Sequence, residues 1–453
     1  METLQTILYF LLTIGVLVLV HEMGHFLAAV ACGMRAEVFA LGMGNRVLGW
    51  NKITRFTFGK LNDETDLQGN TDYRLAAFPI GGYVKIAGMI DESLDTNFQS
   101  SEPQPWEYRA KPVWKRMIVI SAGVIMNILL AIGIFWGINY VQGDSFMQTT
   151  EIGMVINDSP AAKAGLQTGD KILSINNEKI EHWEAIQKAI YFDFIGQDIV
   201  MNVERNGIQQ TFNISHSNIP DVTESSFGII PIHTEAIIND VLPGRPAERA
   251  GLKPDDVILS LNGQKVFNQE HVVKIVHANA SKPVTIEVRR NEEVKTLSVT
   301  PSEEGLIGIT VGSRYTGPVL TVQHGLFESF PKAVTQTFSS VFLLYHSLKQ
   351  IVVGNAEFSK SVGGPIKIAE MAGKTSKYGF GYFVSLLAML SISLAVLNIL
   401  PFPALDGGHL MVLIYEAIVR KPLPNIVQIR IQQVGMVILL GFMMFVLYND
   451  IFG

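Results

Sequence analysis

His21-Glu22-Met23-Gly24-His25 follows directly on Val18-Leu19-Val20, in a nearly unbroken apolar stretch that begins at Leu4. On an α-helix, two histidines four residues apart project from the same face, so both imidazoles can bind one metal ion. Zinc held in this way lowers the pKa of a water molecule to about 7 and polarises a peptide carbonyl, and Glu22 is placed to accept the proton. The stretch therefore predicts a zinc-dependent peptidase site within a membrane helix.

The alternative is a buried pair of structural histidines. The chain has 10 His in 453 residues, and chance would place this pattern in on the order of one chain in a hundred. Ionisable residues inside an apolar segment are costly and by default functional, which favours the zinc interpretation. A catalytic zinc usually has three protein ligands and one open position, so another part of the chain must supply the third.

The composition suits a membrane protein with sizeable soluble parts. Of the 453 residues, 48% are hydrophobic and 17% charged, and the mean hydropathy is +0.27. The net charge of -6 argues against a nucleic-acid binder. The single cysteine, Cys32, excludes an intramolecular disulfide and is expected to serve packing.

Four segments are long and apolar enough to cross a bilayer. They are Leu4 to Ala31, Val113 to Val141, Phe380 to Pro401, and Val434 to Tyr448. The first is expected to be a retained span, because Met1-Glu2 offers no basic region and the apolar run exceeds the roughly 7–15 residues of a signal peptide. The last is short, so it starts earlier, near Ile426, or lies in a locally thinned bilayer.

Basic residues near the ends of the spans set the expected orientation. The side reached after the first span carries Arg35, Arg109, Lys111, Lys115, Arg116, Arg420, Lys421 and Arg430. This side is therefore expected to be cytoplasmic, although Lys374 and Lys377 on the other side weigh against it. Both termini and the insert from Gln142 to Tyr378 then lie outside. His21 lies 17 residues after Leu4, about 26 Å along a helix, so the histidines lie toward the cytoplasmic side.

A candidate third zinc ligand follows the third span. This span runs in the same direction as the first and ends in Asn398-Ile399-Leu400-Pro401-Phe402-Pro403-Ala404-Leu405-Asp406-Gly407-Gly408-His409. Asp406 reaches a depth comparable to that of the histidines, just past two helix-breaking prolines. The alternative is an ordinary carboxylate of a cytoplasmic loop.

Between the first two spans, Tyr73 to Ile86 reads as two short strands around a Pro/Gly turn. The segment has few charges and adjoins the membrane. A strand edge beside a protease site can bind an extended substrate as an added strand, but an ordinary cytoplasmic hairpin explains the pattern equally well.

The outer insert contains an internal repeat. Ser159–Leu166 (SPAAKAGL) matches Arg245–Leu252 (RPAERAGL) at an offset of 86 residues, and the match continues through Asp170–Asn176 and Asp256–Asn262. Two domains of about 85–90 residues are expected, each mixing strands with a helix and long enough to fold alone. They resemble the PDZ domains of envelope proteases, whose surface recognises a peptide terminus or screens substrates sterically.

After the repeats, Phe327 to Val353 has apolar residues at helical spacing, interrupted by Lys332, His346 and Lys349. An amphipathic helix is expected, lying on the membrane or against the outer domains. A fifth span is the weaker alternative, because charges interrupt it.

Taken together, these motifs resemble the site-2 proteases, which are intramembrane zinc metalloproteases. The motifs that match are His21–His25 in the first span, Ser121–Asn127 in the second, Leu405-Asp406-Gly407 after the third, and the tandem PDZ-like units. The resemblance implies that His21, His25 and Asp406 are the zinc ligands and that Glu22 is the catalytic base. It also implies that Asn398 helps to hold the substrate near the metal and that Gly81-Gly82-Tyr83 belongs to a membrane-associated loop that engages it.

The resemblance further implies regulated intramembrane proteolysis at the cell inner membrane, in an envelope stress response. An anti-sigma factor, first trimmed outside by another protease, is then cut within its transmembrane helix, and remnant signal peptides are further substrates. In this scheme the PDZ-like units are periplasmic and exclude bulky untrimmed substrates, while the active site lies toward the cytoplasm.

The expected fold is thus a multi-pass α-helical membrane protein, with about four transmembrane helices and tandem α+β PDZ-like domains between the second and third. The expected divisions are helix 1 at 1–32, a cytoplasmic or membrane-associated region with the hairpin at 33–112, helix 2 at 113–141, PDZ-like domains at 142–220 and 221–312, the amphipathic helix and connecting segment at 313–376, helix 3 at 377–403, the LDG loop and a cytoplasmic segment at 404–430, and helix 4 at 431–453.

Two other classes of function stay open. A catalytically silent membrane scaffold would use the PDZ-like units for binding, but it has no need of Glu22 beside the histidines. A zinc transporter would also place His and Asp in the membrane, but it would not need a large peptide-binding insert. Metal content together with peptide cleavage separates the three.

Overall fold

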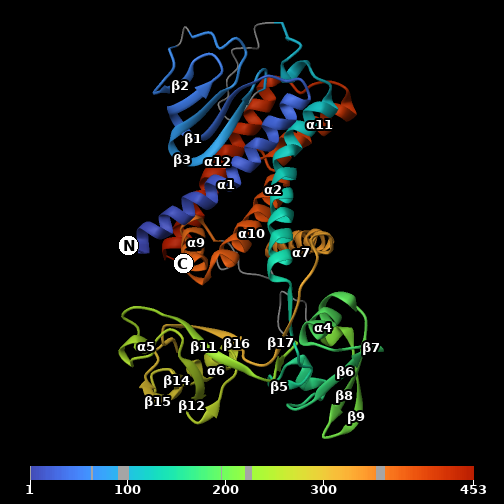
Figure 1. The fold of residues 1–453 in the computed structure, drawn as a ribbon, viewed down its shortest axis with the longest axis vertical. Coiled ribbons are helices and arrows are strands. Elements are labelled where there is room, and N and C mark those ends of the chain that lie inside the picture. The colour runs from blue at the N-terminus through green and yellow to red at the C-terminus, as the bar shows by residue number, and fades with distance from the viewer. Residues whose placement is uncertain are drawn as a thin grey trace. The chain divides into compact units, whose positions relative to one another are not determined.

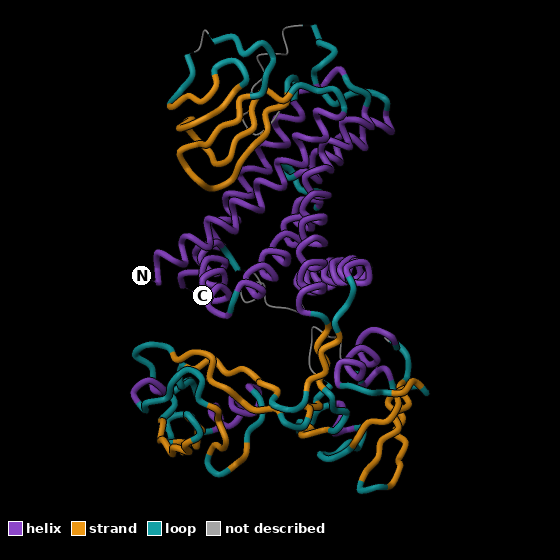
Figure 2. Tube along the Cα trace, viewed as in Figure 1, coloured by secondary structure: helices purple, strands orange, loops and turns teal. Residues whose placement is uncertain are grey.

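The computed structural model describes residues 2–62, 65–89, 102–194, 196–219, 227–353 and 363–452. It consists of two compact units, one formed by Met1–Gly143 with Gln323–Gly453 and the other by Asp144–Val322. The first unit is mainly helical and carries one sheet, and the second is built mainly from strands (Figures 1 and 2).

Four helices among the described residues are long and apolar enough to cross a membrane, and they lie where the sequence predicts spans. They are α1 (Glu2–Ala31), α2 (Val113–Gln142), α10 (Phe380–Ile399) and α12 (Asn425–Phe452). Pro112 precedes α2, and Gly143 ends it with φ of +68°. The start of α12 at Asn425 confirms the earlier start expected near Ile426.

Among its described residues, the first unit has three further α-helices. They are α7 (Leu326–Val353), α9 (Pro365–Tyr378) and α11 (Asp406–Val419). The predicted helix from Phe327 to Val353 is formed as α7, and it packs on α2 and α10 through a cluster that includes Phe135, Ala333 and Ile392.

The segment 404–430, expected as the LDG loop and a cytoplasmic segment, contains the helix α11. Residues from Leu410 to Ile418 are strong helix formers or apolar residues, and their packing outweighs the cost of the two glycines in the first turn. Leu413 is buried. Asp406 is therefore the first residue of a helix and not a loop residue.

The sheet of the first unit comprises β1 (Ala36–Asn51), β2 (Arg55–Phe58) and β3 (Asp72–Ile86), in the order β2-β1-β3. The first half of β1 pairs on both sides with β3, since Phe39 is a partner of both Tyr73 and Val84. The halves of β3 around the Pro/Gly turn thus form the two strands that the sequence predicts. Among the described strands, Gly82–Ile86 pairs with β1 alone, which makes it an edge.

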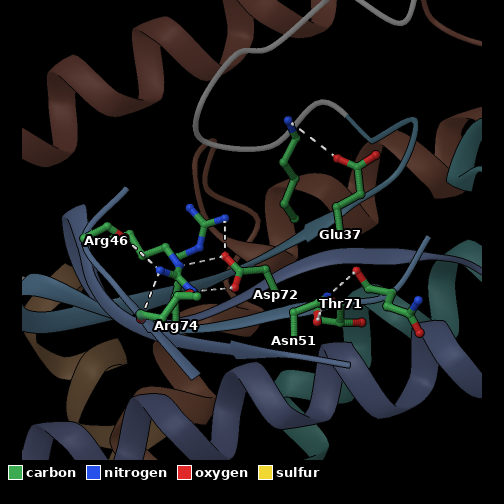
Figure 3. Close-up of polar contacts among 10 residues, drawn as sticks. Glu37, Arg46, Asn51, Thr71, Asp72 and Arg74 are labelled. Atoms are coloured by element: carbon green, nitrogen blue, oxygen red, sulfur yellow. Dashed lines mark hydrogen bonds and ion pairs between the residues drawn. The ribbon is translucent and has the colours of Figure 1, made fainter. Parts of the chain in front are cut away.

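A buried ion cluster holds this sheet together (Figure 3). The Asp72 carboxylate is fully buried and binds two guanidinium groups, from Arg46 at 3.2 Å and Arg74 at 2.8 Å. Arg46 also donates to the backbone oxygens of Thr57 and Gly59, which tie β2 to β1. Because Asp72 and Arg46 link β3, β1 and the end of β2, the cluster helps to fix the register of all three strands.

The second unit contains the two PDZ-like repeats. The first includes β5 (Ile152–Val155), α3 (Pro160–Lys163), β6 (Lys171–Ile175), β7 (Glu178–Lys179), α4 (Trp183–Lys188), β8 (Ile199–Arg205), β9 (Ile208–Ile214) and β10 (Ile229–Pro231). The second includes β11 (Thr234–Val241), α5 (Pro246–Arg249), β12 (Val257–Leu261), β13 (Gln264–Lys265), α6 (Gln269–Ala278), β14 (Val284–Arg290), β15 (Glu293–Val299) and β16 (Ile309–Tyr315).

The two repeats share an ion pair at equivalent positions. Arg205 binds the buried Asp170 and the carbonyl of Gly165, and Arg290 binds the buried Asp256 and the carbonyl of Gly251. Each repeat also has its own apolar core. The strands at the two ends of the unit, β4 (Asp144–Met147) and β17 (Val319–Val322), pair with each other. The repeat read from the sequence is therefore a repeat in structure.

The expected boundary between the repeats at 220/221 falls in residues 220–226, outside the described residues. Phe227 belongs to the core of the first repeat, and β10 pairs with β5 of that repeat. The chain of the first repeat therefore extends to Pro231.

Candidate active site

Three side chains from α1 and α11 bring their ligand atoms together. Oδ2 of Asp406 lies 3.2 Å from Nε2 of His21 and 3.5 Å from Nε2 of His25, and the two Nε2 atoms are 3.2 Å apart. Tetrahedral zinc with ligand bonds of about 2.0–2.1 Å separates its ligand atoms by about 3.3 Å. In the part of the chain that the structure describes, this is the only such group of three metal-binding side chains.

The chemistry of this group fits a cation. Oδ2 of Asp406 is buried and has no hydrogen-bond donor among the described residues. A carboxylate oxygen facing two imidazole nitrogens that carry lone pairs would be repelled by them, unless a positive ion lies between the three. Two nitrogens and one oxygen, with a fourth position left to the cavity, form the donor set of a catalytic zinc.

The helix α2 sets the orientation of both imidazoles. Nδ1 of His25 donates to the carbonyl oxygen of Val119 at 2.8 Å, which leaves the lone pair of Nε2 for a metal. Nδ2 of Asn127 lies 3.1 Å from Nδ1 of His21, while Nε2 of the same ring faces Asp406. The Ser121–Asn127 motif singled out from the sequence thus supports the ligands directly.

Gly123 lies on the same face of α2, directly against the two rings. A Cβ atom at this position would lie 2.4 Å from Nε2 of His25 and 2.7 Å from Cε1 of His21. Both distances are far below van der Waals contact, so a larger residue would displace the ligands. Glycine is thus required here for α2 to approach the metal site.

Glu22 and the edge of β3 face the same cavity as the ligands. The cavity has a volume of about 770 Å³, and its lining includes His21, Glu22, His25, Asp406 and the strand Gly82–Ile86. The Glu22 carboxylate interacts with the backbone of Val84. A Cβ atom at Gly82 would lie 2.8 Å from Cγ1 of Val18, so the absence of a side chain lets the strand approach α1. The volume lies in the range of a ligand-binding site, and an open strand edge forms one wall.

The structure brings two of the four predicted substrate-binding residues to the lining of this cavity and a third close to a ligand. Gly82 and Tyr83 line it, and Nδ2 of Asn398 lies 3.4 Å from Nε2 of His21. Gly81 is not part of the lining; it lies in the turn of β3, with φ of +80°.

Sequence reasoning missed several residues at the site. Arg74, Lys85 and His409 line the cavity, and Gln432 of α12 lies 3.2 Å from His409. Asn127 belongs to the motif quoted from the sequence, but no contact with His21 was predicted for it, although an amide in the middle of a 30-residue apolar helix is costly unless it has a partner. Gln432 gave a similar signal, because it lies in the apolar helix α12, whereas the others lie outside the spans.

Comparison with known proteins agrees with this geometry. The model of peptidase family M50 matches residues 9–442. A relative from Vibrio cholerae is 32% identical over 99% of both chains. "Protease RseP" of Yersinia pestis is 29% identical over 99% of both chains, and "Regulator of sigma E protease" of Salmonella typhi is 28% identical over 97% of both. The chain therefore belongs to peptidase family M50 and is a membrane-spanning zinc metalloprotease of the site-2 type.

Proposed function

We propose that this protein cleaves transmembrane segments of membrane proteins that another protease has already trimmed. The substrate class includes an anti-sigma factor in an envelope stress response, and remnant signal peptides. Two relatives named as regulators of sigma E protease support this proposal, because their similarity covers nearly the whole chain.

In this proposal His21, His25 and Asp406 hold zinc, which supplies a Lewis acid for the scissile carbonyl and makes a water molecule more acidic. Glu22 follows His21 directly and lines the same cavity, so it serves as the general base that accepts the water proton. Asn398, within 3.4 Å of a ligand nitrogen, donates from its amide to the substrate backbone beside the scissile bond.

The substrate must unwind before it can react, because a helix hides its carbonyls in its own hydrogen bonds. The edge strand Gly82–Ile86 offers backbone donors and acceptors beside Glu22. An unwound substrate segment that pairs with this edge regains the bonds it lost, in the manner of strand addition. Gly82 and Tyr83 belong to that edge, and Gly81 forms the turn that leads into it.

The membrane placement follows from the charges near the helix ends. The basic residues between the first two spans and around α11 favour a cytoplasmic location for this side, which also carries the metal ligands. The second unit, Asp144–Val322, is then periplasmic, at the inner membrane. There the PDZ-like repeats exclude substrates with bulky outer domains.

The observation that carries the proposal is the convergence of three ligand atoms, Glu22 and a strand edge on one cavity. The test compares the purified full chain with its Glu22→Gln variant. Zinc is quantified in both proteins, and cleavage of a single-span model substrate is measured in proteoliposomes. We expect about one zinc per chain in both proteins, and cleavage reduced at least ~100-fold in the variant, since a general base contributes 10²–10⁴-fold. Mass spectrometry of the products locates the scissile bond.

The matched control is Glu370→Gln, an exposed carboxylate on α9 that does not line the cavity. It should keep both zinc and activity. Equal cleavage by wild type and Glu22→Gln would remove the role of Glu22. A wild-type protein without zinc, or a cut outside the membrane segment, would contradict the proposal.

A further inference from the structure

One face of α2 contacts both histidine ligands and the helix that carries the third ligand. Arg116, Val119, Gly123 and Asn127 are spaced by three, four and four residues, so they lie along one side of the helix. The last three contact the imidazoles of His21 and His25. Arg116, at the start of this row, contacts the helix that carries the remaining ligand.

Arg116 forms a two-pronged ion pair with Glu416 of α11. Nη1 donates to Oε2 at 3.0 Å, and Nη2 donates to Oε1 at 2.5 Å. The side chains are only 13% and 12% exposed. Arg116 is itself held in place, because Nε donates to the carbonyl of Lys111 and the guanidinium lies over the ring of Tyr108. A paired fork of this kind fixes orientation as well as distance.

Glu416, the partner of Arg116 in this ion pair, lies ten residues after Asp406 in the same helix. The helix α11 packs beside α2 (Figure 1), and Leu413, one turn before Glu416, is buried. A 14-residue helix is rigid over this length, so a shift or rotation at Glu416 moves Asp406 as well.

The N-terminal end of α11 is held by packing and not by a cap: Gly407 lies against the backbone of Leu400, and Gln432 of α12 lies 3.2 Å from His409. Its N-cap residue is Leu405, which provides no side-chain cap hydrogen bond. The preceding Ala404 has φ of +74°, a conformation that costs a non-glycine residue of the order of 1 kcal/mol. The ion pair at the other end of α11 adds to these contacts and helps to hold the strained entry and the ligand that follows it.

We infer that Arg116 and Glu416 are positioning residues, which act through α11 to place Asp406 against His21 and His25. This inference rests on the assignment of these three residues as zinc ligands under the proposed function. In this arrangement α2 positions all three ligands. The carbonyl of Val119 contacts His25, and the amide of Asn127 contacts His21. The ion pair with Glu416 acts on the helix that carries Asp406.

The test is a double-mutant cycle read out as zinc affinity, measured on the full chain in detergent by competition with a chelator of known affinity. Arg116→Gln and Glu416→Gln should each weaken zinc binding by about 10–100-fold, the usual range for residues that support metal ligands. The double variant should bind zinc no more weakly than either single one, since all three proteins lack the same interaction.

Two controls separate positioning from general stability. Arg109→Gln removes the ion pair between Arg109 and Glu107, two residues outside α11, and it should leave zinc affinity unchanged. Thermal unfolding of the zinc-free proteins shows whether the variants remain folded. Glu416→Asp, which keeps the charge, should recover part of the lost affinity.

The outcomes distinguish this inference from the proposed function. If folded Arg116→Gln and Glu416→Gln proteins bind zinc as tightly as the wild type, while Asp406→Ala does not, the inference is wrong and the ligand assignment stands. The inference is also overturned if the losses in the two single variants add in the double variant. If Asp406→Ala binds zinc as tightly as the wild type, the ligand assignment itself fails.

Discussion

Gly123 marks the point where the backbone of α2 meets both imidazoles. Gly123→Ala would place a Cβ atom 2.4 Å from Nε2 of His25, so either the rings or the helices must move. Such overpacking typically costs about 1–3 kcal/mol. We expect the variant to lose zinc in dialysis against a chelator that leaves the wild type loaded, with zinc measured by mass spectrometry.

Gly133→Ala provides the matched comparison at the residue scale. Gly133 lies in the same helix, and a Cβ atom there would meet nothing within 4 Å. Zinc retention should match the wild type, because the added methyl group touches no ligand. Retention of zinc by Gly123→Ala would show that α2 can withdraw from the site without loss of the metal.

At the scale of elements, the sheet depends on one buried carboxylate. Asp72→Asn leaves the guanidinium of Arg46, only 3% exposed, without its charged partner. Removing one partner of a buried ion pair costs about 3–5 kcal/mol. Limited proteolysis should therefore cut within residues 36–86 faster than in the wild type. Zinc should stay bound, because the sheet supplies no ligand, while cleavage of the substrate falls with the disordered strand edge.

Glu37→Gln tests the specificity of this effect within the same sheet. The Glu37 carboxylate (Figure 3) lies 3.6 Å from Nζ of Lys85, and the two side chains are 44% and 34% exposed. Exposed pairs contribute about 0–1 kcal/mol, so proteolysis should be nearly unchanged. If protease cut both variants equally fast, the loss of a negative charge, and not the burial of the carboxylate, would account for the faster cleavage.

At the scale of the whole molecule, the second unit is a separable insert. Asp144 and Val322 are paired residues of β4 and β17, so a short Gly/Ser linker can join Gly143 to Gln323 in its absence. The shortened chain should bind zinc and cleave trimmed substrates, because all the proposed site residues lie in the first unit. If the repeats exclude bulky substrates, it should also cleave untrimmed ones that the full chain refuses.

Two measurements accompany this deletion. The excised unit Asp144–Val322 should unfold cooperatively by itself, since each repeat has its own core and ion pair. Gel assays with trimmed and untrimmed forms of one substrate report the exclusion. If the shortened chain cleaves the trimmed form but still does not cleave the untrimmed form, the first unit is responsible for the selection.

The sequence alone determined the features that depend on local spacing. Four apolar stretches predicted the spans, a spacing of four residues put His21 and His25 on one helix face, and an 86-residue offset predicted two similar domains. It also indicated Asp406 as a candidate partner of the histidines. A helical period, the length of an apolar run and a repeated segment are patterns along the chain, so they can be read without knowledge of the packing.

Tertiary structure decided what depends on contacts between distant segments. It made the expected loop around Asp406 into the helix α11, and it placed Gly123 and Asn127 against the imidazoles. It also paired Arg116 with Glu416 and left one edge of β3 open beside Glu22. These features could not be read from the sequence, because each depends on how closely and at what rotation two elements pack. Only the assembled core sets those two quantities.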